Sequence, residues 1–568
     1  MEKEPIIEFT DFTFQYYSQA EPTLYNINLK IYPGEKILIV GPSGSGKSTL
    51  GHCLNGLIPF YYKGNVEGSL KIEGTETREL DIFKLSKIIG TVLQDSDGQF
   101  VGLTVGEDIA FAMENDCVPH DEMHTRVDRV AAMVDIAHVK NLSPYELSGG
   151  QKQRTSLAGV LIDDVDILLF DEPLANLDPA TGKTAIEIID DIHKQMGKTI
   201  IIIEHRLEDV LHRDVDRVIV INEGRIIADM NAHDLVSSDV LKENGIREPL
   251  YVTALKYANV RVTPQMKPGH IWSLDTSAVN EALRSWNRSV QTPQEAPPRP
   301  SLLTIDHLSF SYDGVRPTLS DINFEVTEGE MVSIVGKNGA GKSTLAKLMC
   351  GFEKVDKGAI LYKGEDIRKQ SIKERAEFIG FVMQNPNQMI SKNLIFDEVA
   401  LGLRLRGVAE EEIKQRVEKV LEICGLAPFI EWPISALSYG QKKRVTIASI
   451  LVLRPNILIL DEPTAGQDYR HYSEIMEFLR HINETGVSII LITHDMHLML
   501  EYTPRAIVLS EGKLITDTQA SVVLTDQYVI EKANLKETSL FQLAQLAGIP
   551  DGTQFVQHFI DYERVVVK

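Results

Sequence analysis

The 568-residue chain has little cysteine, and its four cysteines are scattered. None stands in a CxxC pair, so the sequence suggests neither a structural zinc site nor a disulfide framework. A reducing, cytoplasmic setting fits this cysteine usage best. The four are Cys53, Cys117, Cys350 and Cys424.

Long apolar runs are missing as well. No stretch approaches the ~18 apolar residues that a membrane-spanning helix needs, and the opening MEKEPIIEFT carries charge where a signal peptide has an apolar run. We therefore expect a chain that does not cross a membrane itself but can dock on one.

Positive charge is scarce. The chain has 58 Lys and Arg residues against 81 Asp and Glu, a formal net charge of −23. This is the wrong sign for a protein that relies on broad neutralisation of phosphates, so we expect no nucleic-acid partner.

The most informative feature present is an internal repeat. DFTFQYYSQAEPTLYNINLKIYPGEKILIVGPSGSGKSTL is echoed by HLSFSYDGVRPTLSDINFEVTEGEMVSIVGKNGAGKSTL. Lys47 and Lys342, near the ends of these strings, lie 295 residues apart, and later echoes keep nearly this offset. The chain thus contains two copies of one unit.

A proline-rich stretch, SVQTPQEAPPRPS, separates the two copies and favours an extended linker. A short segment after each copy, GIREPLYVTALKYANV and LKETSLFQLAQLAGI, suggests a small C-terminal appendage. We predict a first catalytic domain at 1–240, an appendage at 241–288, the linker at 289–301, a second catalytic domain at 302–517 and a second appendage at 518–568.

Short apolar runs such as KILIV, DILLF and TIIII alternate with helical patterns in each copy. Such runs are typical of parallel strands buried on both faces, so the predicted fold class is α/β. KILIV and MVSIV lead directly into glycine-rich loops, which places those loops at the ligand-binding edge of each sheet.

Both glycine-rich loops match the P-loop pattern, follow a predicted strand and precede a predicted helix. We expect their backbone N–H groups to turn toward phosphates, Lys47 and Lys342 to reach the β/γ-phosphates, and Ser48 and Ser343 to bind Mg²⁺. This motif alone equally suits a kinase, a GTPase or a helicase motor. The expected ATP-binding residues are Gly41, Pro42, Ser43, Gly44, Ser45, Gly46, Lys47, Ser48 and Thr49, then Gly336, Lys337, Asn338, Gly339, Ala340, Gly341, Lys342, Ser343 and Thr344.

More specific strings follow each P-loop. LSGGQKQR and DILLFDEP in the first copy, with LSYGQKKR and NILILDEP in the second, resemble the signature and Walker B motifs of the ABC ATPase family. The resemblance covers residues 6–229 and 302–517. It implies two P-loop cassettes that bind ATP and Mg²⁺ as cofactors and hydrolyse ATP.

The DE pair after each buried strand supplies two carboxylates with different tasks. We expect Asp171 and Asp461 to hold Mg²⁺, directly or through water. Glu172 and Glu462 are expected to orient and deprotonate the attacking water.

The family resemblance implies further site residues. Gln94 and Gln384 match the Q-loop glutamine that senses Mg²⁺ and water, and His205 and His494 match the switch histidine that contacts the γ-phosphate. Asp178 and Asp468 match the D-loop.

Tyr16 and Tyr312 resemble the aromatic residue that stacks on adenine. Tyr17 is a rival in the first copy, and core packing remains an alternative for these tyrosines.

The resemblance also implies that the cassettes pair head to tail, so that each site is shared. One site combines Lys47 and its motifs with Ser438 and Gly440, and the other combines Lys342 and its motifs with Ser148 and Gly150. Tyr439 replaces the first of the paired signature glycines. Because both catalytic glutamates remain, we expect both sites to hydrolyse ATP, with any asymmetry at the site built on Lys47.

Three functions compete for this ATPase. QDSDGQFVGLTVGEDIAFAMEN, QNPNQMISKNLIFDEVALGL and EHRLE resemble the ATPases of energy-coupling factor (ECF) importers of vitamins or metal ions. That resemblance implies a peripheral protein on the cytoplasmic face of the cell membrane. Its partners would be a transmembrane coupling subunit and a substrate-capturing membrane protein. The alternatives are a soluble ABC protein acting on ribosomes or nucleic acid, and a tandem sugar-importer ATPase.

Overall fold

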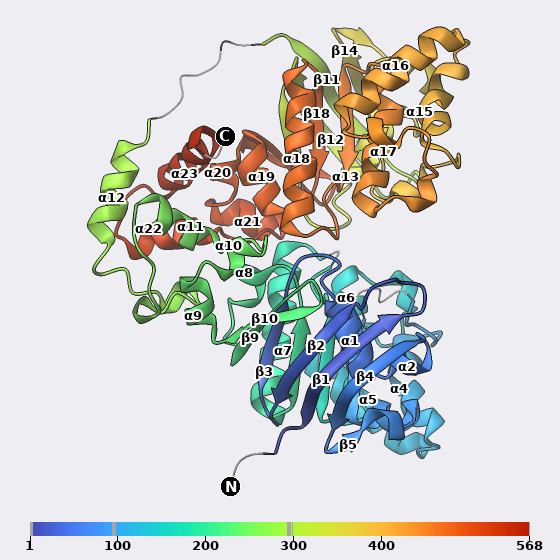
Figure 1. Ribbon diagram of the computed structural model, residues 1–568. Helices are drawn as coiled ribbons and strands as arrows, with labels where there is room; N and C mark the ends of the chain where they lie inside the picture. Colours follow the sequence, from blue (N-terminus) through green and yellow to red (C-terminus); the bar gives the residue numbers. More distant parts are fainter. Residues whose placement is uncertain (1–3, 94–97, 176, 292–296, 298, 567–568) are drawn as a thin grey trace. The chain divides into compact units, whose positions relative to one another are not determined.

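The computed structural model describes residues 4–93, 98–175, 177–291, 297 and 299–566 (Figure 1). The chain divides into two compact units, of which the first consists mainly of residues 1–286 and the second mainly of residues 287–568. The two catalytic domains are built alike, and each is described by itself below.

Two sheets form the first copy. The smaller has the order β2-β1-β4-β5, with β1 (Ile7–Tyr16) pairing antiparallel to both β2 (Leu24–Ile31) and β4 (Gly64–Ile72). Its last strand is β5 (Thr75–Glu76). Phe9 and Phe14 of β1 are both buried although they lie an odd number of positions apart, because a bulge between Thr10 and Thr13 shifts the alternation.

The larger sheet of the first copy has the order β10-β9-β3-β8-β7-β6. All neighbours are parallel except the edge pair β9 and β10, which agrees with the α/β prediction. Its strands are β3 (Lys36–Val40), β6 (Ile89–Val92), β7 (Ile167–Asp171), β8 (Thr199–Ile203), β9 (Arg217–Asn222) and β10 (Arg225–Met230).

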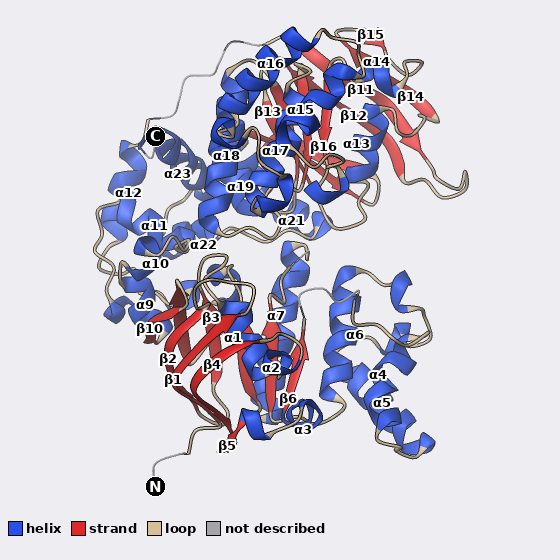
Figure 2. Cartoon of the chain, turned by 45° about the vertical axis from the view of Figure 1, so that its right-hand side comes forward, coloured by secondary structure: helices blue, strands red, loops and turns tan. Residues whose placement is uncertain are grey.

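Two groups of helices in the first copy bear on the predicted site, and three short helices, α2 (Leu57–Phe60), α3 (Ile82–Ile88) and α8 (Leu207–Val210), lie outside them. Helices α1 (Lys47–Leu54) and α7 (Pro179–Met196) follow the P-loop and the Walker B strand. The other group, α4 (Val105–Asn115), α5 (His120–Met133) and α6 (Gly149–Leu161), forms a helical subdomain, which Figure 2 shows to one side of the strands. Helix α4 begins at a capping box made by Thr104 and Glu107, a strong local start signal.

The second copy repeats this plan, with a small sheet β12-β11-β14-β15 and a large sheet β16-β17-β18-β13-β19-β20. The strands are β11 (Ser301–Phe310), β12 (Leu319–Thr327), β13 (Met331–Val335), β14 (Lys357–Tyr362), β15 (Glu365–Asp366), β16 (Ile379–Val382), β17 (Ile457–Asp461), β18 (Ser488–Ile492), β19 (Arg505–Ser510) and β20 (Lys513–Gln519). The corresponding helices are α13 (Lys342–Cys350), α15 (Ile395–Arg404), α16 (Glu410–Ile423), α17 (Tyr439–Leu451), α18 (Tyr469–Glu484) and α19 (Met496–Tyr502).

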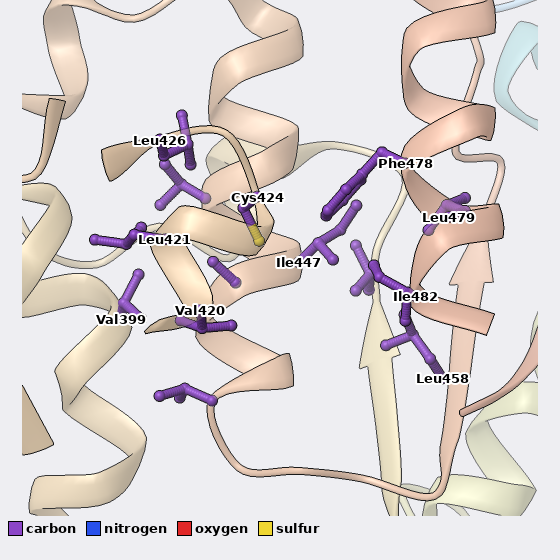
Figure 3. Packing of buried hydrophobic residues seen from close by; sticks show 14 of the residues in the cluster. Val399, Val420, Leu421, Cys424, Leu426, Ile447, Leu458, Phe478, Leu479 and Ile482 are labelled. Carbon is purple, nitrogen blue, oxygen red and sulfur yellow. The ribbon is translucent and has the colours of Figure 1, made fainter. Parts of the chain in front are cut away.

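One apolar cluster joins the helical subdomain of the second copy to its sheet (Figure 3). Val399 of α15 and Leu421 of α16 belong to the same cluster as Ile447 of α17, Phe478 of α18 and Leu458 of β17. Continuous packing of this kind holds the signature helix α17 at a set position relative to the Walker B strand.

The large sheets differ at the first residue of their central strands. Lys36 begins β3 and forms an ion pair with Asp190 of α7, and both side chains are almost fully buried. Lys194 also reaches Asp190, at 2.6 Å. In the second copy Met331 begins β13 and packs in the apolar cluster instead.

Helices and loops follow each large sheet. After β10 come α9 (Ala232–Ser237), α10 (Val240–Glu243), α11 (Leu250–Tyr257) and α12 (Asn280–Ser289); after β20 come α20 (Ala520–Val523), α21 (Gln527–Ala533), α22 (Ser539–Leu546) and α23 (Gly552–Val566). Strands β11 and β20 extend slightly beyond the range 302–517. None of the helices in the described part of the chain is long and apolar enough to cross a bilayer.

Candidate active sites

The P-loop of the first copy wraps around its lysine. Lys47 is buried, and its Nζ donates hydrogen bonds to the carbonyl oxygens of Gly41 (2.8 Å) and Pro42 (2.9 Å). Burial lowers the pKa of this amine, while the nearby Glu172 carboxylate opposes that shift. Such a lysine gains a better partner when phosphate oxygens enter the loop.

Glycine is required at the loop's closing turn. Gly46 has φ 101° and a Cβ there would lie 2.9 Å from the Thr23 carbonyl oxygen, so both its conformation and its contacts exclude a side chain. Gly341 takes the same place in the second copy with φ 98°, where Lys342 Nζ donates to Gly336 at 2.8 Å and to Lys337 at 3.0 Å. The two predicted phosphate cradles therefore share one geometry.

The residues predicted to hold Mg²⁺ lie together in each copy. Asp171 ends β7, and its carboxylate shares a hydrogen bond with Ser48 at the start of α1. Its Oδ1 is buried and makes no hydrogen bond within the part of the chain that the structure describes. An unsatisfied carboxylate oxygen beside a hydroxyl fits Mg²⁺, which prefers oxygen ligands.

Burial raises the pKa of Asp171 to about 6, and the neighbouring Glu172 carboxylate adds to the shift. In the second copy, burial likewise raises the pKa of Asp461, and a hydrogen bond with Ser343 opposes the rise. A cation would relieve this crowding of negative charge.

The predicted catalytic glutamates sit on unusual backbone. Glu172 has φ 49° and Glu462 has φ 46°, the left-handed region that side chains other than glycine rarely adopt. Each backbone N–H donates to the end of the adjacent strand, to Ile203 and Ile492 respectively, at 2.8 Å. The same backbone conformation at this position in both copies shows that the turns after the two Walker B strands are built alike.

The two switch histidines lie beside these glutamates but contact them differently. His494 Nδ1 is 2.7 Å from Glu462 Oε1. His205 Nδ1 is 3.9 Å from Glu172 Oε1 and only 3.1 Å from Glu204 Oε1. The structure therefore brings each predicted histidine to the Walker B edge, with a different nearest carboxylate in each copy.

The tyrosines proposed for adenine stacking both lean on the P-loop helix. Tyr16 OH lies 3.1 Å from Thr49 Oγ1, and Tyr312 OH lies 3.4 Å from Thr344 Oγ1. Each ring also packs edge-on against the phenylalanine two residues earlier. The rival Tyr17 is 71% exposed.

Each signature serine begins a helix. The Ser148 hydroxyl accepts a hydrogen bond from Gln151 N at the start of α6, and Ser438 does the same with Gln441 N at the start of α17. A Cβ on Gly150 would lie 2.4 Å from Thr181 Cγ2, whereas at Gly440 the nearest contact is 3.9 Å. Helix N-termini of this kind can bind an anion.

Comparison with known proteins decides the family. The ABC transporter model matches residues 24–175 and 319–465. A second model, described as an ATP-binding cassette cobalt transporter, matches residues 238–310, and a third, described as an AAA domain, matches residues 430–501. An ABC transporter ATP-binding protein of Clostridium perfringens is 59% identical over 99% of both chains. The chain belongs to the ABC transporter ATP-binding protein family.

Other relatives agree. A Photobacterium profundum protein of the same description is 54% identical over 98% of this chain and 99% of its own. Among solved structures, cbiO1 of Clostridium perfringens, described as part of the ABC transporter complex cbiONQ, is 35% identical and covers 41% of this chain and 94% of its own, with a TM-score of 0.38. The chain is thus an ABC ATPase with two cassettes, and it hydrolyses ATP to drive transport.

The second cassette departs from the first around its signature helix. Tyr439 OH donates to the Gln384 carbonyl oxygen at 3.3 Å, and Lys443 Nζ donates to the same oxygen at 2.7 Å. Burial lowers the pKa of Lys443 to about 8 despite the nearby Asp461 and Glu462. Two side chains of α17 thus hold the backbone of the predicted Q-loop. Gln94, its predicted counterpart, lies outside the described residues.

Sequence reasoning missed Glu204 and Lys443. Glu172 and Glu204 are separated by 31 residues in the sequence, so the sequence gives no direct sign that they lie close together. A usable signal was present, since aligned motifs place Glu204 opposite Thr493 and Lys443 opposite Gln153. A charged residue in one copy that aligns with a neutral residue in the other indicates a buried charge with a specific partner.

Proposed function

We propose that the chain is the energy-coupling ATPase of an importer of the ECF type, which carries a vitamin or a metal ion. The match of residues 238–310 to the cobalt-transporter ATP-binding model is the observation that carries this proposal. The match includes the segment between the cassettes, which lies apart from the general ABC matches. Among the candidate cargoes, it favours a divalent metal ion.

Two composite ATP sites complete the proposal. One consists of Lys47, Glu172 and His205 with Ser438 and Gly440, and the other is its counterpart with Ser148 and Gly150. Buried β- and γ-phosphates would contact both cassettes, and hydrolysis would remove that bridge. ATP thereby drives a two-state change through its different affinity for the closed and open forms.

Mg²⁺ would be held by Ser48 and Asp171 in one site and by Ser343 and Asp461 in the other, with the Q-loop glutamines nearby. When bound, it neutralises charge on the phosphates. The lysines position the phosphates, and the glutamates take a proton from the attacking water. The switch histidines contact the γ-phosphate.

We place the protein on the cytoplasmic face of the cell membrane as a peripheral subunit. Its partners are a transmembrane coupling protein and a small membrane protein that captures the cargo. In each cassette the helical subdomain that follows the Q-loop, including α4 and α15, supplies the docking surface for the coupling protein.

Co-purification tests this assignment. A tagged chain, extracted with mild detergent from the membranes of its native host, is expected to bring down two integral membrane proteins in fixed ratio. A matched preparation from the membrane-free lysate is expected to lack them. Recovery with ribosomes, or with a periplasmic sugar-binding system, would contradict the assignment and favour one of the two alternatives.

A further inference from the structure

In the two cassettes, different carboxylates contact the predicted switch histidine. In the second cassette the contact comes from Glu462. Its Oε1 accepts from His494 Nδ1 at 2.7 Å and its Oε2 accepts from the Thr493 hydroxyl at 3.3 Å. A single glutamate is there engaged with both residues that follow β18.

The first cassette has a second glutamate in the position of Thr493. Glu204 directly follows β8, and its side chain is 0% exposed. Its Oε1 lies 3.1 Å from His205 Nδ1, nearer than the 3.9 Å between His205 Nδ1 and Glu172 Oε1.

Backbone groups from two loops satisfy this buried carboxylate. Glu204 Oε1 accepts from the N–H groups of His205 (2.9 Å) and Arg206 (3.2 Å), and Oε2 accepts from Leu174 N–H (3.2 Å). A buried charge is tolerated when such donors surround it. The donors also fix the carboxylate relative to the segment after Glu172, because Leu174 lies only two residues beyond it.

An ionised carboxylate accepts hydrogen bonds but cannot donate them. His205 Nδ1 faces this carboxylate at 3.1 Å, a contact that favours a hydrogen on Nδ1 and leaves Nε2 for another partner. A carboxylate that orients a histidine in this way commonly supports its role without touching the substrate.

We propose that Glu204 is a positioning residue of the first ATP site, which holds His205 so that Glu172 is left to act on the attacking water. The inference rests on the roles proposed for His205 and Glu172. In the second site Glu462 performs both tasks, with Thr493 in place of the additional carboxylate. The two sites thus reach the same chemistry with different numbers of acidic groups.

A double-mutant cycle in the full chain tests the inference. Glu204→Thr, His205→Ala and the double variant are compared in the unmodified chain and in a chain carrying Glu462→Gln, which limits turnover to the first site. We expect Glu204→Thr to lower kcat of that site about tenfold, the effect of losing one close contact between His205 and a carboxylate. The KM for ATP should change less than about twofold.

The double variant is expected to be no slower than His205→Ala alone, because Glu204 acts through the histidine. Glu204→Gln keeps an acceptor oxygen and the side-chain shape, and it should retain kcat within about threefold. Thermal unfolding of each variant shows whether the fold is intact.

The inference about Glu204 would be overturned if the losses of kcat were additive in the double variant, or if Glu204→Gln lost as much kcat as Glu204→Thr. Either result would leave the proposed catalytic roles in place. An unchanged kcat in His205→Ala in both backgrounds would overturn the role of the histidine, and the inference with it.

Discussion

Asp171, which we propose to hold Mg²⁺, is destabilising to the fold when no cation is bound. The residue is buried, lies against Glu172 and has one oxygen without a partner in the described structure. Because its pKa is raised to about 6, the folded protein binds a proton there more readily than the unfolded chain does. Its ionisation therefore lowers stability as the pH rises from about 4 through 6.

We predict that Asp171→Asn stabilises the nucleotide-free protein at pH 7.5, by up to about 2 kcal/mol. The gain should shrink as the pH falls and vanish near pH 4, where the native carboxyl is already neutral. Differential scanning calorimetry without Mg²⁺ across this range measures it.

Asp191→Asn on the exposed face of α7 serves as the control for that experiment. Its effect is expected to stay within about 0.5 kcal/mol at every pH. If Asp171→Asn destabilises the protein at pH 7.5, the ionised carboxylate of Asp171 has stabilising partners and the prediction is wrong.

At the scale of elements, the central strand of the large sheet makes different contacts at its first residue in the two cassettes. In the first cassette the start of β3 and helix α7 are joined by the buried Lys36–Asp190 ion pair. Burial raises the pKa of Asp190, but hydrogen bonds from Lys194 and Lys36 outweigh it and lower the pKa overall. In the second cassette Met331 makes an apolar contact at this place.

We predict that Asp190→Ala lowers the stability of the first cassette by about 3–5 kcal/mol, because it leaves the Lys36 ammonium buried without its main partner. The loss should fade as the pH falls through the carboxyl range, where the native Asp190 becomes protonated. Urea unfolding of the full chain measures the change as a lower free energy of unfolding in the less stable of its transitions.

The double variant Lys36→Met with Asp190→Leu replaces the ion pair with an apolar pair and is the matched control. It should recover most of the lost stability, since an apolar pair can replace a buried ion pair. If the double variant is as unstable as Asp190→Ala, packing at this place rather than unpaired charge governs the loss.

Local patterns predicted the elements near the sites well, and tertiary contacts explain what they missed. KILIV and MVSIV became central parallel strands, and both P-loops lead into helices that begin at the P-loop lysine. Glu204, Lys443 and the left-handed backbone of Glu172 depend instead on segments far apart in the sequence. Spacing within a motif carries no information on such contacts.

At the scale of the whole molecule, the proposed pairing determines which cassette surfaces meet. Head-to-tail pairing would bring the P-loop of one cassette to the signature of the other. Ser43 in the first P-loop and Tyr439 at the start of α17 are both exposed, and they lie at the two motifs concerned. A cross-link between them can therefore report the pairing.

We predict that the Ser43→Cys, Tyr439→Cys chain forms an intramolecular disulfide under mild oxidation, and that ATP increases its yield when Glu172→Gln and Glu462→Gln block hydrolysis. Replacing the exposed Cys117 with serine keeps the native thiols from interfering, because Cys53, Cys350 and Cys424 are buried. Mobility on non-reducing gels measures the product.

The control pairs Ser43→Cys with Gly149→Cys, which places the second thiol on the signature of the same cassette. This protein should form no intramolecular disulfide under the same conditions. Equal yields from both pairs, with or without ATP, would contradict head-to-tail pairing.

At the left-handed backbone position of Glu172 and Glu462, folding stability and the proposed ATPase activity favour different residues. Glycine adopts this conformation freely, so Glu172→Gly would relax the backbone while removing the carboxylate. Selection for a sturdier protein alone would drive these two positions toward glycine. Glutamate at both positions is what the proposed role in turnover requires, against the conformational preference of the polypeptide chain.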